Sequence, residues 1–297
     1  MTKQSLETAY ADCERTARRH YENFPVASLL LPKRLRRPIS VIYAFARHAD
    51  DLADEGNASA QQRLQALDDF GGRLDAAAQG QAQPDDPLFT ALADILARYR
   101  LPVILFHDLL HAFRMDVTKT RYADVEEVLH YCRYSANPVG RLLLHLQSAA
   151  SPENLRDSDA ICTALQLINF LQDIDQDYSE NNRIYLPVDE MARRGITERD
   201  LQQRLTTPAL RALIDDQIDR ARCLMLSGAP LALRLGGRFG LELRMIVLGG
   251  LCVLRRLERR RDNVFTRPRL TGRDWWWMLG HSLRPCLSRR NWPPTGR

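Results

Sequence analysis

Apolar residues recur at every third or fourth position along most of the chain, which is the spacing of one helix face. No stretch alternates apolar and polar residues with the period of two that indicates a half-buried strand. The pattern therefore predicts an all-α protein. Prolines, glycines and polar clusters interrupt it and mark the ends of these predicted helices: about 3–20, 38–54, 59–78, 87–100, 102–116, 124–147, 158–178, 189–194, 197–205, 208–234 and 238–261.

Several of these interruptions have a specific meaning. Asn137-Pro138 lies inside a predicted helix and must kink or break it, because proline lacks the N–H that the helix needs. Pro38 fits the first turn of the second helix, and Gly56 fits its C-terminal cap. The glycine-rich segment Gly236–Gly240 stands between two predicted helices and follows no strand. It is therefore predicted to be a helix–helix turn and not a nucleotide-binding loop.

The chain shows no internal repeat, low-complexity segment or long linker that would divide it. Its 297 residues are enough for one large domain or two ordinary ones. Near the C-terminus the composition becomes rich in arginine and tryptophan. We therefore predict one all-α domain over residues 1–262, followed by a basic, Trp-rich tail over residues 263–297.

One predicted helix carries polar side chains on a narrow stripe of an otherwise apolar segment. At roughly 100° per residue, Asn169, Asp173 and Asp177 lie one turn apart on the same face, with Gln166 at its edge. A buried carboxylate must be paired or must hold a cation. Oxygen ligands without His or Cys suit a hard ion such as Mg²⁺. The alternative is an aspartate pair that forms salt bridges with arginines elsewhere in the chain.

A second stripe lies on the helix predicted before Gly56. Tyr43, Arg47, Asp50 and Asp54 follow one another at intervals of four, three and four residues and share a sector of roughly 60°. Taken alone, this could be an ordinary Arg–Asp pair on a helix surface. Four carboxylates around one cavity, however, repel one another unless cations lie between them. Mg²⁺ ions bridging to a diphosphate would solve this, with arginines neutralising the remaining phosphate charge.

Three segments carry a resemblance to a known family. Asp-Asp-Leu-Ala-Asp at 50–54, the segment 169–177 and Arg-Ile-Tyr-Leu-Pro at 183–187 resemble the two aspartate motifs of the squalene/phytoene synthase family. The resemblance extends from about residue 20 to at least residue 260. It implies the isoprenoid synthase fold, a single-domain helical bundle around a deep apolar cavity with the aspartates at its mouth. It also implies an enzyme that acts on prenyl diphosphates.

Finer features resemble the hydroxysqualene synthases of bacterial hopanoid biosynthesis, in the segments 21–28, 131–140 and 169–173. Most phytoene and dehydrosqualene synthases carry Arg where Gln172 stands, and a Val-Ala-Gly run in place of residues 135–137. The resemblance implies a carbon–oxygen lyase that ionises presqualene diphosphate and captures the cation with water. The alternatives are a squalene or phytoene synthase, which is a transferase that joins two prenyl diphosphates head to head, and a non-catalytic assembly factor of the same family.

The resemblance also assigns roles to single residues. The predicted metal ligands, for Mg²⁺ or Mn²⁺, are Asp50, Asp54, Asn169, Asp173 and Asp177. The predicted catalytic residues are the four aspartates of that set together with two tyrosines that could stabilise a carbocation: Asp50, Asp54, Asp173, Asp177, Tyr43 and Tyr131. The predicted substrate-binding residues are His20, Arg47, Asn137, Gln166, Arg183 and Tyr185. For each tyrosine the alternative is packing in the core, and for the histidine it is a structural role.

Other features of the sequence bear on whether NADPH is used and on where in the cell the protein is located. No Gly-rich strand–turn–helix is present, so no NADPH is expected. The six cysteines are scattered without a CxxC pair, which favours reduced thiols in the cytoplasm. The N-terminal residues are charged, and the longest uncharged apolar run, 245–254, falls far short of the roughly 20 residues of a membrane-spanning helix. We therefore predict a cytoplasmic protein.

The basic tail suggests a partner. The net charge of +5 does not by itself indicate nucleic acid, and none is predicted. Tryptophan favours the depth of lipid headgroups and arginine is drawn to anionic lipid. Residues 270–290 are therefore predicted to attach the protein to the inner face of the membrane, unless the tryptophans pack on the bundle. The expected partners are presqualene diphosphate and other enzymes of the squalene and hopanoid pathway.

Overall fold

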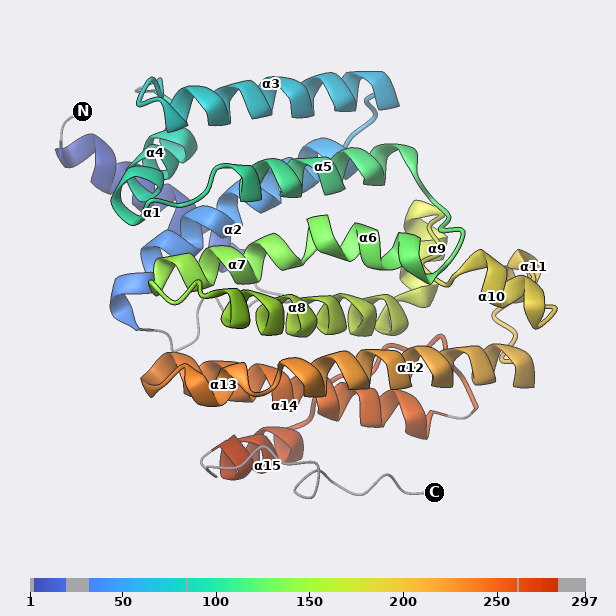
Figure 1. The fold of residues 1–297 in the computed structure, drawn as a ribbon. Coiled ribbons are helices and arrows are strands. Elements are labelled where there is room, and N and C mark those ends of the chain that lie inside the picture. Colours follow the sequence, from blue (N-terminus) through green and yellow to red (C-terminus); the bar gives the residue numbers. More distant parts are fainter. Residues whose placement is uncertain (1–2, 20–31, 84, 261, 283–297) are drawn as a thin grey trace. The chain divides into compact units, whose positions relative to one another are not determined.

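The computed structural model describes residues 3–19, 32–83, 85–260 and 262–282 (Figure 1). These residues form helices and contain no β-strand, which confirms the all-α prediction. The helices are α1 Lys3–Arg19, α2 Lys33–Asp54, α3 Ala60–Ala78, α4 Pro87–Tyr99, α5 Ile104–Thr118, α6 Val125–Ser135, α7 Asn137–Leu146, α8 Pro152–Gln172, α9 Ile174–Asn181, α10 Val188–Arg193, α11 Glu198–Gln202, α12 Pro208–Gly228, α13 Leu231–Arg234, α14 Gly237–Arg259 and α15 Gly272–Ser282.

The chain divides into two compact units, each continued by a second segment of sequence. The N-terminal unit comprises Met1–Thr118 and Asn137–Leu155, and the C-terminal unit comprises Lys119–Ala136 and Arg156–Arg297. The first aspartate stripe therefore lies in the N-terminal unit and the second in the C-terminal unit. The boundary predicted between residues 262 and 263 stays a prediction.

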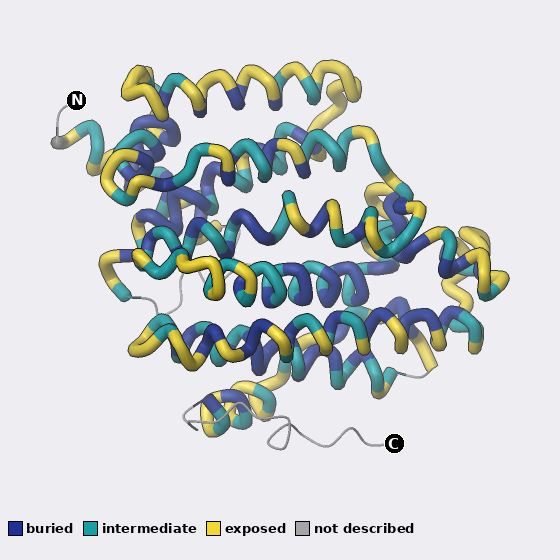
Figure 2. The backbone as a smooth tube through the Cα atoms, viewed as in Figure 1, coloured by how far each residue is buried: buried dark blue, intermediate teal, exposed yellow. Residues whose placement is uncertain are grey.

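Helix α2 forms the centre of the N-terminal unit, and its middle, residues 38–45, is mostly buried (Figure 2). Phe45 has no exposed surface. Its ring lies 5.0 Å from that of Phe70 on α3, 6.4 Å from that of Phe89 on α4 and 5.1 Å from that of Phe106 on α5. Tilted and edge-to-face ring pairs at these distances are favourable. The cluster anchors the middle of α2, the helix that carries the first aspartate stripe.

The C-terminal unit is built on three long helices that approach one another at glycines. A Cβ atom on Gly228 of α12 would clash with the carbonyl oxygen of Asp157 on α8. A Cβ atom on Gly250 of α14 would lie 2.7 Å from Met225 Cε of α12 and 3.2 Å from Ile168 Cδ1 of α8. Interiors packed at this density tolerate little added volume. The second aspartate stripe thus lies at the end of a tightly held helix.

Two predicted helix starts are wrong, and in each case a proline occupies a position in the helix that the prediction did not give it. Helix α2 begins at Lys33, so Pro38 lies inside it and not in its first turn. Proline cannot donate to the carbonyl of Arg34 four residues earlier, and that carbonyl accepts the Tyr99 hydroxyl at 3.5 Å instead. Helix α8 begins at Pro152, six residues before the predicted start. Proline is favourable at the first position of a helix.

Other predicted boundaries agree with the structure or differ by a single break. The chain breaks between α6 and α7 at Ala136, directly before Asn137-Pro138, as predicted. The helix predicted over 208–234 ends at Gly228, and Pro230 separates it from the short α13. The predicted helix–helix turn between α13 and α14 consists of Leu235 and Gly236 alone, and Gly237, at a φ of 63°, already begins α14. Within its described residues, 263–282, the basic tail contains a helix that the sequence pattern did not predict, α15.

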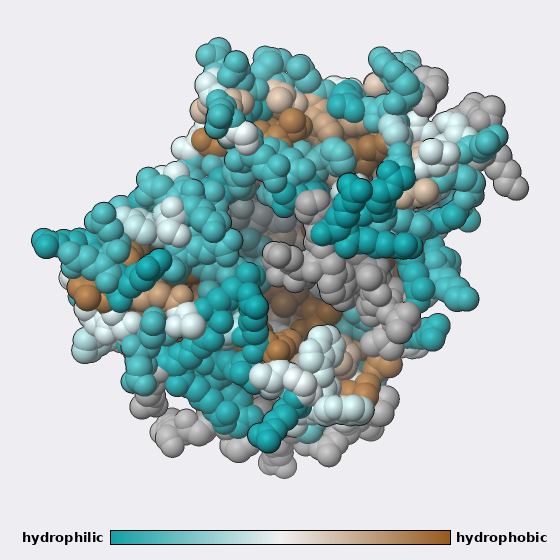
Figure 3. All heavy atoms as spheres, turned by 180° about the vertical axis from the view of Figure 1, so that it is seen from behind, coloured by the Kyte–Doolittle hydropathy of each residue, from teal (hydrophilic) through white to brown (hydrophobic). Residues whose placement is uncertain are grey.

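The face drawn in Figure 3 is largely hydrophilic, with apolar residues showing in smaller areas. None of the described helices combines the length and the hydropathy that crossing a bilayer requires.

Candidate active site

Arg47 organises the first aspartate stripe, on α2. Its Nη1 lies 3.1 Å from Asp50 Oδ2, and its Nη2 lies 2.5 Å from Asp51 Oδ1 and 2.6 Å from Glu55 Oε1. Burial lowers the pKa of Arg47, but the three carboxylates outweigh burial and raise that pKa above its ordinary value. The sequence pattern placed Asp50 beside Arg47. It did not predict that Asp51 and Glu55 also form ion pairs with Arg47.

The end of this stripe is fixed by an arginine from the next helix. Arg63 of α3 donates to the carbonyl oxygens of Ala53 at 2.6 Å, Gly56 at 2.8 Å and Ala58 at 3.1 Å. Gly56 takes a φ of 76°, as expected for a helix-capping glycine. These contacts hold the last turn of α2, where Asp54 is exposed.

Two further predicted residues lie in the N-terminal unit. Tyr43 is half-buried on α2, one turn before Arg47. Asn137 is buried and forms the first residue of α7. His20 lies outside the described residues.

The second aspartate stripe spans the junction of α8 and α9. The prediction placed Asn169, Asp173 and Asp177 on one continuous helix, but α8 ends at Gln172 and Asp173 precedes α9 with φ −110° and ψ 17°. The Asp173 N–H still donates to the Asn169 carbonyl at 2.9 Å, and the Asp177 N–H to the Asp173 carbonyl at 2.8 Å. The one-turn spacing of the three residues therefore survives the break. Gln166 lies half-buried on α8, one turn earlier.

A segment from the predicted tail lies against this junction. Arg267 Nε lies 2.7 Å from Asp173 Oδ1, and the Gln172 amide donates to the Pro268 carbonyl at 3.0 Å. Val264 and Phe265, just before, are buried. The sequence pattern grouped Arg267 with the other arginines of the tail, and nothing in its spacing set it apart. Residues 264–268 thus belong to the surroundings of the second stripe.

Asp175 has a different environment from its neighbours Asp173 and Asp177. Both of its carboxylate oxygens bind Arg204, at 2.5 and 3.0 Å. Arg204 follows α11 and adopts a φ of 52°. Asp175 therefore forms a structural ion pair, in agreement with its predicted position off the stripe.

The segment 183–187 is held beside residues 120–123 by backbone hydrogen bonds. The Ile184 N–H donates to the Thr120 carbonyl at 2.9 Å, and the Val188 N–H to the Tyr122 carbonyl at 2.9 Å. Arg183 is buried, and its N–H donates to the Asp177 carbonyl at 2.9 Å. The predicted phosphate ligand Arg183 is thus tied to the second stripe through the backbone.

Arg121 anchors the same segment from its other side. Its Nε and Nη2 lie 2.8 Å from the two carboxylate oxygens of Glu198, and its Nη2 donates to Asn182 Oδ1 at 3.0 Å. These hydrogen bonds to Glu198 raise the pKa of Arg121. The sequence pattern did not identify Arg121, because its partners are distant in the chain.

Four aromatic rings gather next to the second stripe. Phe170 and Tyr185 stack with centroids 3.6 Å apart and planes at 8°, and Tyr122 stacks on Tyr185 at 5.4 Å. Tyr131 lies 5.6 to 6.0 Å from each of the other three. The predicted tyrosines Tyr131 and Tyr185 are thus brought together, and the structure adds two rings that the sequence did not single out. Such ring faces can stabilise a cation.

The donor atoms of both stripes suit a hard divalent cation. They are carboxylate and amide oxygens. In each unit an arginine forms an ion pair with one of the aspartates, Arg47 with Asp50 and Arg267 with Asp173. Mg²⁺ is usually held by one or two carboxylates together with substrate phosphates and water. Within the described part of the chain, no three His, Cys, Asp or Glu side chains form a ready metal cluster.

Comparisons with known proteins show the family of the chain. The sequence model of the squalene/phytoene synthase family matches residues 17–276. Over 240 residues the chain is 40% identical to a hydroxysqualene synthase of Rhodopseudomonas palustris, covering 80% of each chain. Over 230 residues it is 34% identical to a 15-cis-phytoene synthase of Synechococcus elongatus, covering 73% of each. The crystal structure of squalene synthase HpnC from Alicyclobacillus acidocaldarius matches with a TM-score of 0.82 and 38% identity, covering 88% of this chain and 97% of that one.

The helical fold is that of the isoprenoid synthases, as predicted. The chain belongs to the squalene/phytoene synthase family. Enzymes of this family act on prenyl diphosphates and use a divalent metal to ionise the diphosphate.

Proposed function

We propose that this protein is a hydroxysqualene synthase. It takes up presqualene diphosphate, releases diphosphate and adds water to the rearranged carbocation, which makes it a carbon–oxygen lyase. The observation that carries the proposal is Gln172, whose neutral amide holds the Pro268 carbonyl at 3.0 Å beside Asp173. Most relatives that join two prenyl diphosphates have a cationic arginine there, and Gln172 offers no such charge to a second diphosphate. The 40% identity to a hydroxysqualene synthase supports the same conclusion.

In the proposed reaction, the carbon–oxygen bond to the diphosphate breaks and its electron pair leaves with the phosphate. The residues proposed to hold Mg²⁺ or Mn²⁺ are Asp50, Asp54, Asn169, Asp173 and Asp177. When bound, the ion would supply positive charge that neutralises the leaving group. Arg47, Arg183 and Arg267 add charge-assisted hydrogen bonds to phosphate oxygens.

The aromatic cluster then protects the cation. The faces of Tyr131 and Tyr185 stabilise positive charge, and their stacking on Phe170 and Tyr122 fixes their orientation before the reaction. Tyr43 is assigned the same role from α2. Rings held in place cost no reorganisation while the cation rearranges.

Water capture completes the reaction. A water oxygen forms a bond to the cationic carbon and then loses a proton, so that hydroxysqualene results without any reductant and NADPH is not consumed. Asn137, a buried amide at the start of α7, is proposed to hold this water. Gln166 and His20 are proposed to contact the substrate.

The test supplies purified protein and Mg²⁺ with presqualene diphosphate and, separately, with farnesyl diphosphate alone. Hydroxysqualene is expected from the first, at a rate that NADPH leaves unchanged, and no 30-carbon product from the second. Mass spectrometry of the extracted lipids measures both. A 30-carbon product from farnesyl diphosphate alone would overturn the assignment.

The second candidate is a squalene or phytoene synthase, and the 34% identity to a 15-cis-phytoene synthase favours it. It would yield squalene or phytoene directly from two prenyl diphosphates, which the same assay detects. A non-catalytic assembly factor is disfavoured because Asp50, Asp54, Asp173 and Asp177 are all present.

We also propose a peripheral attachment to the cytoplasmic face of the membrane. The product is a 30-carbon lipid, and Trp275 and Trp276 on α15 are 55% and 77% exposed. Exposed tryptophan beside arginine favours the headgroup region of a bilayer. Attachment there would bring the protein close to other enzymes of the squalene and hopanoid pathway.

A further inference from the structure

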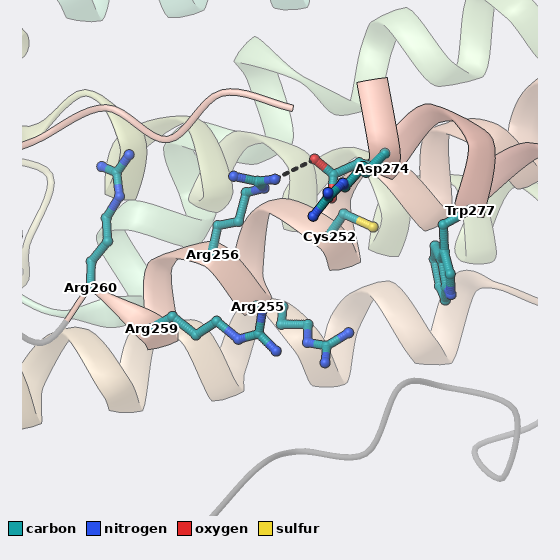
Figure 4. A pocket seen from close by; sticks show the side chains of 8 residues that line it. Cys252, Arg255, Arg256, Arg259, Arg260, Asp274 and Trp277 are labelled. Carbon is teal, nitrogen blue, oxygen red and sulfur yellow. Dashed lines mark hydrogen bonds and ion pairs between the residues drawn. The ribbon is translucent and has the colours of Figure 1, made fainter. Parts of the chain in front are cut away.

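A pocket rich in arginine lies between the last turns of α14 and the first half of α15 (Figure 4). Its volume is about 460 Å³, within the usual range of roughly 300–1,000 Å³ for small-ligand sites. The residues that line this arginine pocket are Cys252, Arg255, Arg256, Arg259, Arg260, Arg273, Asp274 and Trp277. Five arginines and a single carboxylate thus line the pocket.

That carboxylate is already engaged in holding α15 on α14. Arg256 Nη2 lies 2.6 Å from Asp274 Oδ2, and the N–H and hydroxyl of Thr271 donate to the same oxygen at 2.6 and 2.8 Å. Burial raises the pKa of Asp274, but these hydrogen bonds and the Arg256 charge lower it below its ordinary value. Met278 is buried against α14, which completes the attachment. Asp274 is therefore a structural group and leaves the other arginines uncompensated.

The remaining arginines of the pocket, within the described part of the chain, have no acidic partner. They are Arg255, Arg259, Arg260 and Arg273. In Figure 4, Arg255 and Arg259 extend in the same direction from one face of α14, one turn apart. The Nη1 atom of Arg260 is buried without a hydrogen-bond partner. Burial and the neighbouring charge of Arg256 lower the pKa of Arg260. The pocket thus holds a surplus of positive charge.

Compensation of the helix dipole does not account for this surplus. Basic residues often lie at a helix C-terminus because they neutralise its free carbonyl groups. In α14, however, Arg211 of α12 already performs this task. It donates to the carbonyls of Leu257 at 3.1 Å, Glu258 at 3.2 Å and Arg260 at 2.9 Å. The pocket arginines are therefore available to an anion.

The neighbouring surface indicates where that anion comes from. Trp275, Trp276 and Leu279 of α15 are 55%, 77% and 41% exposed. A site for a free anion in solution has no need of exposed tryptophan, whereas a site at the headgroup level of a bilayer does. Guanidinium groups form paired hydrogen bonds with phosphate oxygens.

We propose that the arginine pocket binds the phosphate of an anionic phospholipid headgroup while Trp275 and Trp276 lie among the neighbouring headgroups. This inference rests on the proposed membrane attachment and gives it a specific lipid class and a specific site. Arg255 and Arg259 supply the principal contacts, and α15 is held in place by Asp274 in advance of binding.

The test compares two double variants that lose the same charge. Arg255→Gln with Arg259→Gln removes the pocket contacts. Arg199→Gln with Arg238→Gln is the matched control, because both arginines are exposed in the same unit and lie outside the pocket. Binding is measured by co-sedimentation with phosphatidylcholine vesicles that contain or lack phosphatidylglycerol. The circular dichroism of each variant verifies that it is folded.

The pocket variant is expected to bind phosphatidylglycerol vesicles about 25-fold more weakly than the unaltered protein, roughly fivefold per arginine. The control variant should lose less than about threefold, since salt screens charges at a distance. Equal losses in the two variants would overturn the pocket and leave the membrane attachment standing. Equal binding to vesicles with and without phosphatidylglycerol would also overturn the pocket and leave the membrane attachment standing.

Two further outcomes separate the inference from the proposed function. If the unaltered protein binds no vesicles but converts presqualene diphosphate in detergent, both the pocket and the attachment are wrong and the catalytic assignment stands. A titration with inorganic phosphate, followed by tryptophan fluorescence, distinguishes the source of the anion. If phosphate saturates the pocket and the protein binds no vesicles, the pocket is a site for a free anion, and the proposal that it binds a phospholipid headgroup is overturned.

Discussion

Replacing Asp173 with Asn is expected to lower kcat for presqualene diphosphate by roughly 10²–10³-fold. Asp173 stands at the junction of α8 and α9, where its carboxylate lies 2.7 Å from Arg267 Nε. Asparagine keeps the size of the side chain and one acceptor oxygen but removes the negative charge that would hold the metal on the leaving group. The measurement is steady-state turnover at saturating Mg²⁺.

The control for this prediction is Asp175→Asn, two residues away. Asp175 binds Arg204 through both oxygens and does not belong to the proposed site. Its substitution removes the same charge two residues away, inside α9, so kcat should change less than about threefold, as for the loss of an exposed ion pair. Equal losses of kcat in the two variants would contradict the role given to Asp173.

Replacing Gly228 with Ala is expected to destabilise the protein by about 3 kcal/mol, the upper end of the usual cost of overpacking. The new Cβ would clash with the carbonyl oxygen of Asp157 and lie 2.7 Å from Ile161 Cγ1. Both atoms belong to α8, and a backbone carbonyl cannot turn away as a side chain can. The helices α8 and α12 must therefore separate. Chemical and thermal denaturation, followed by circular dichroism, measures the loss.

Gly72→Ala serves as the control, because it is the same substitution on an exposed helix face. A Cβ at Gly72 of α3 would meet nothing within 4 Å. Alanine has the higher helix propensity, so this variant should be more stable by roughly 0.5–1 kcal/mol. The two substitutions are thus expected to differ in sign. A Gly228→Ala protein as stable as the unaltered one would show that α8 and α12 do not approach this closely.

The sequence was most informative where a property repeats with a helical period. The apolar period predicted the helices, and the break at Asn137-Pro138 followed from the missing proline N–H. The spacing of Tyr43, Arg47 and Asp50 correctly placed these residues on one helix, α2. Such features depend on neighbours within one or two turns, which a sequence displays directly.

Features that depend on distant partners were missed. Pro38 is accommodated inside α2 because a hydroxyl from α4 binds the carbonyl that proline leaves free. Arg267 lies 94 residues after Asp173 in the chain, and no periodicity links the two residues. Tyr122 and Phe170 enter the aromatic cluster only because residues 183–188 fold back beside residues 120–123.

The tail keeps its membrane role as a prediction. Its arginines and tryptophans predicted a surface for anionic lipid, but the composition could not reveal that one aspartate, Asp274, is engaged by Arg256 and Thr271. Nor could it reveal that Arg211 already satisfies the end of α14. Only these contacts separate a general basic character from a defined pocket.

The central claim is that water ends the reaction of presqualene diphosphate. The direct measurement is turnover of presqualene diphosphate by the purified protein with Mg²⁺ in water enriched in ¹⁸O, followed by mass spectrometry of the product. We expect hydroxysqualene that carries one ¹⁸O atom in its hydroxyl group, whether or not NADPH is present. Formation of squalene, or of hydroxysqualene without the label, would contradict the claim.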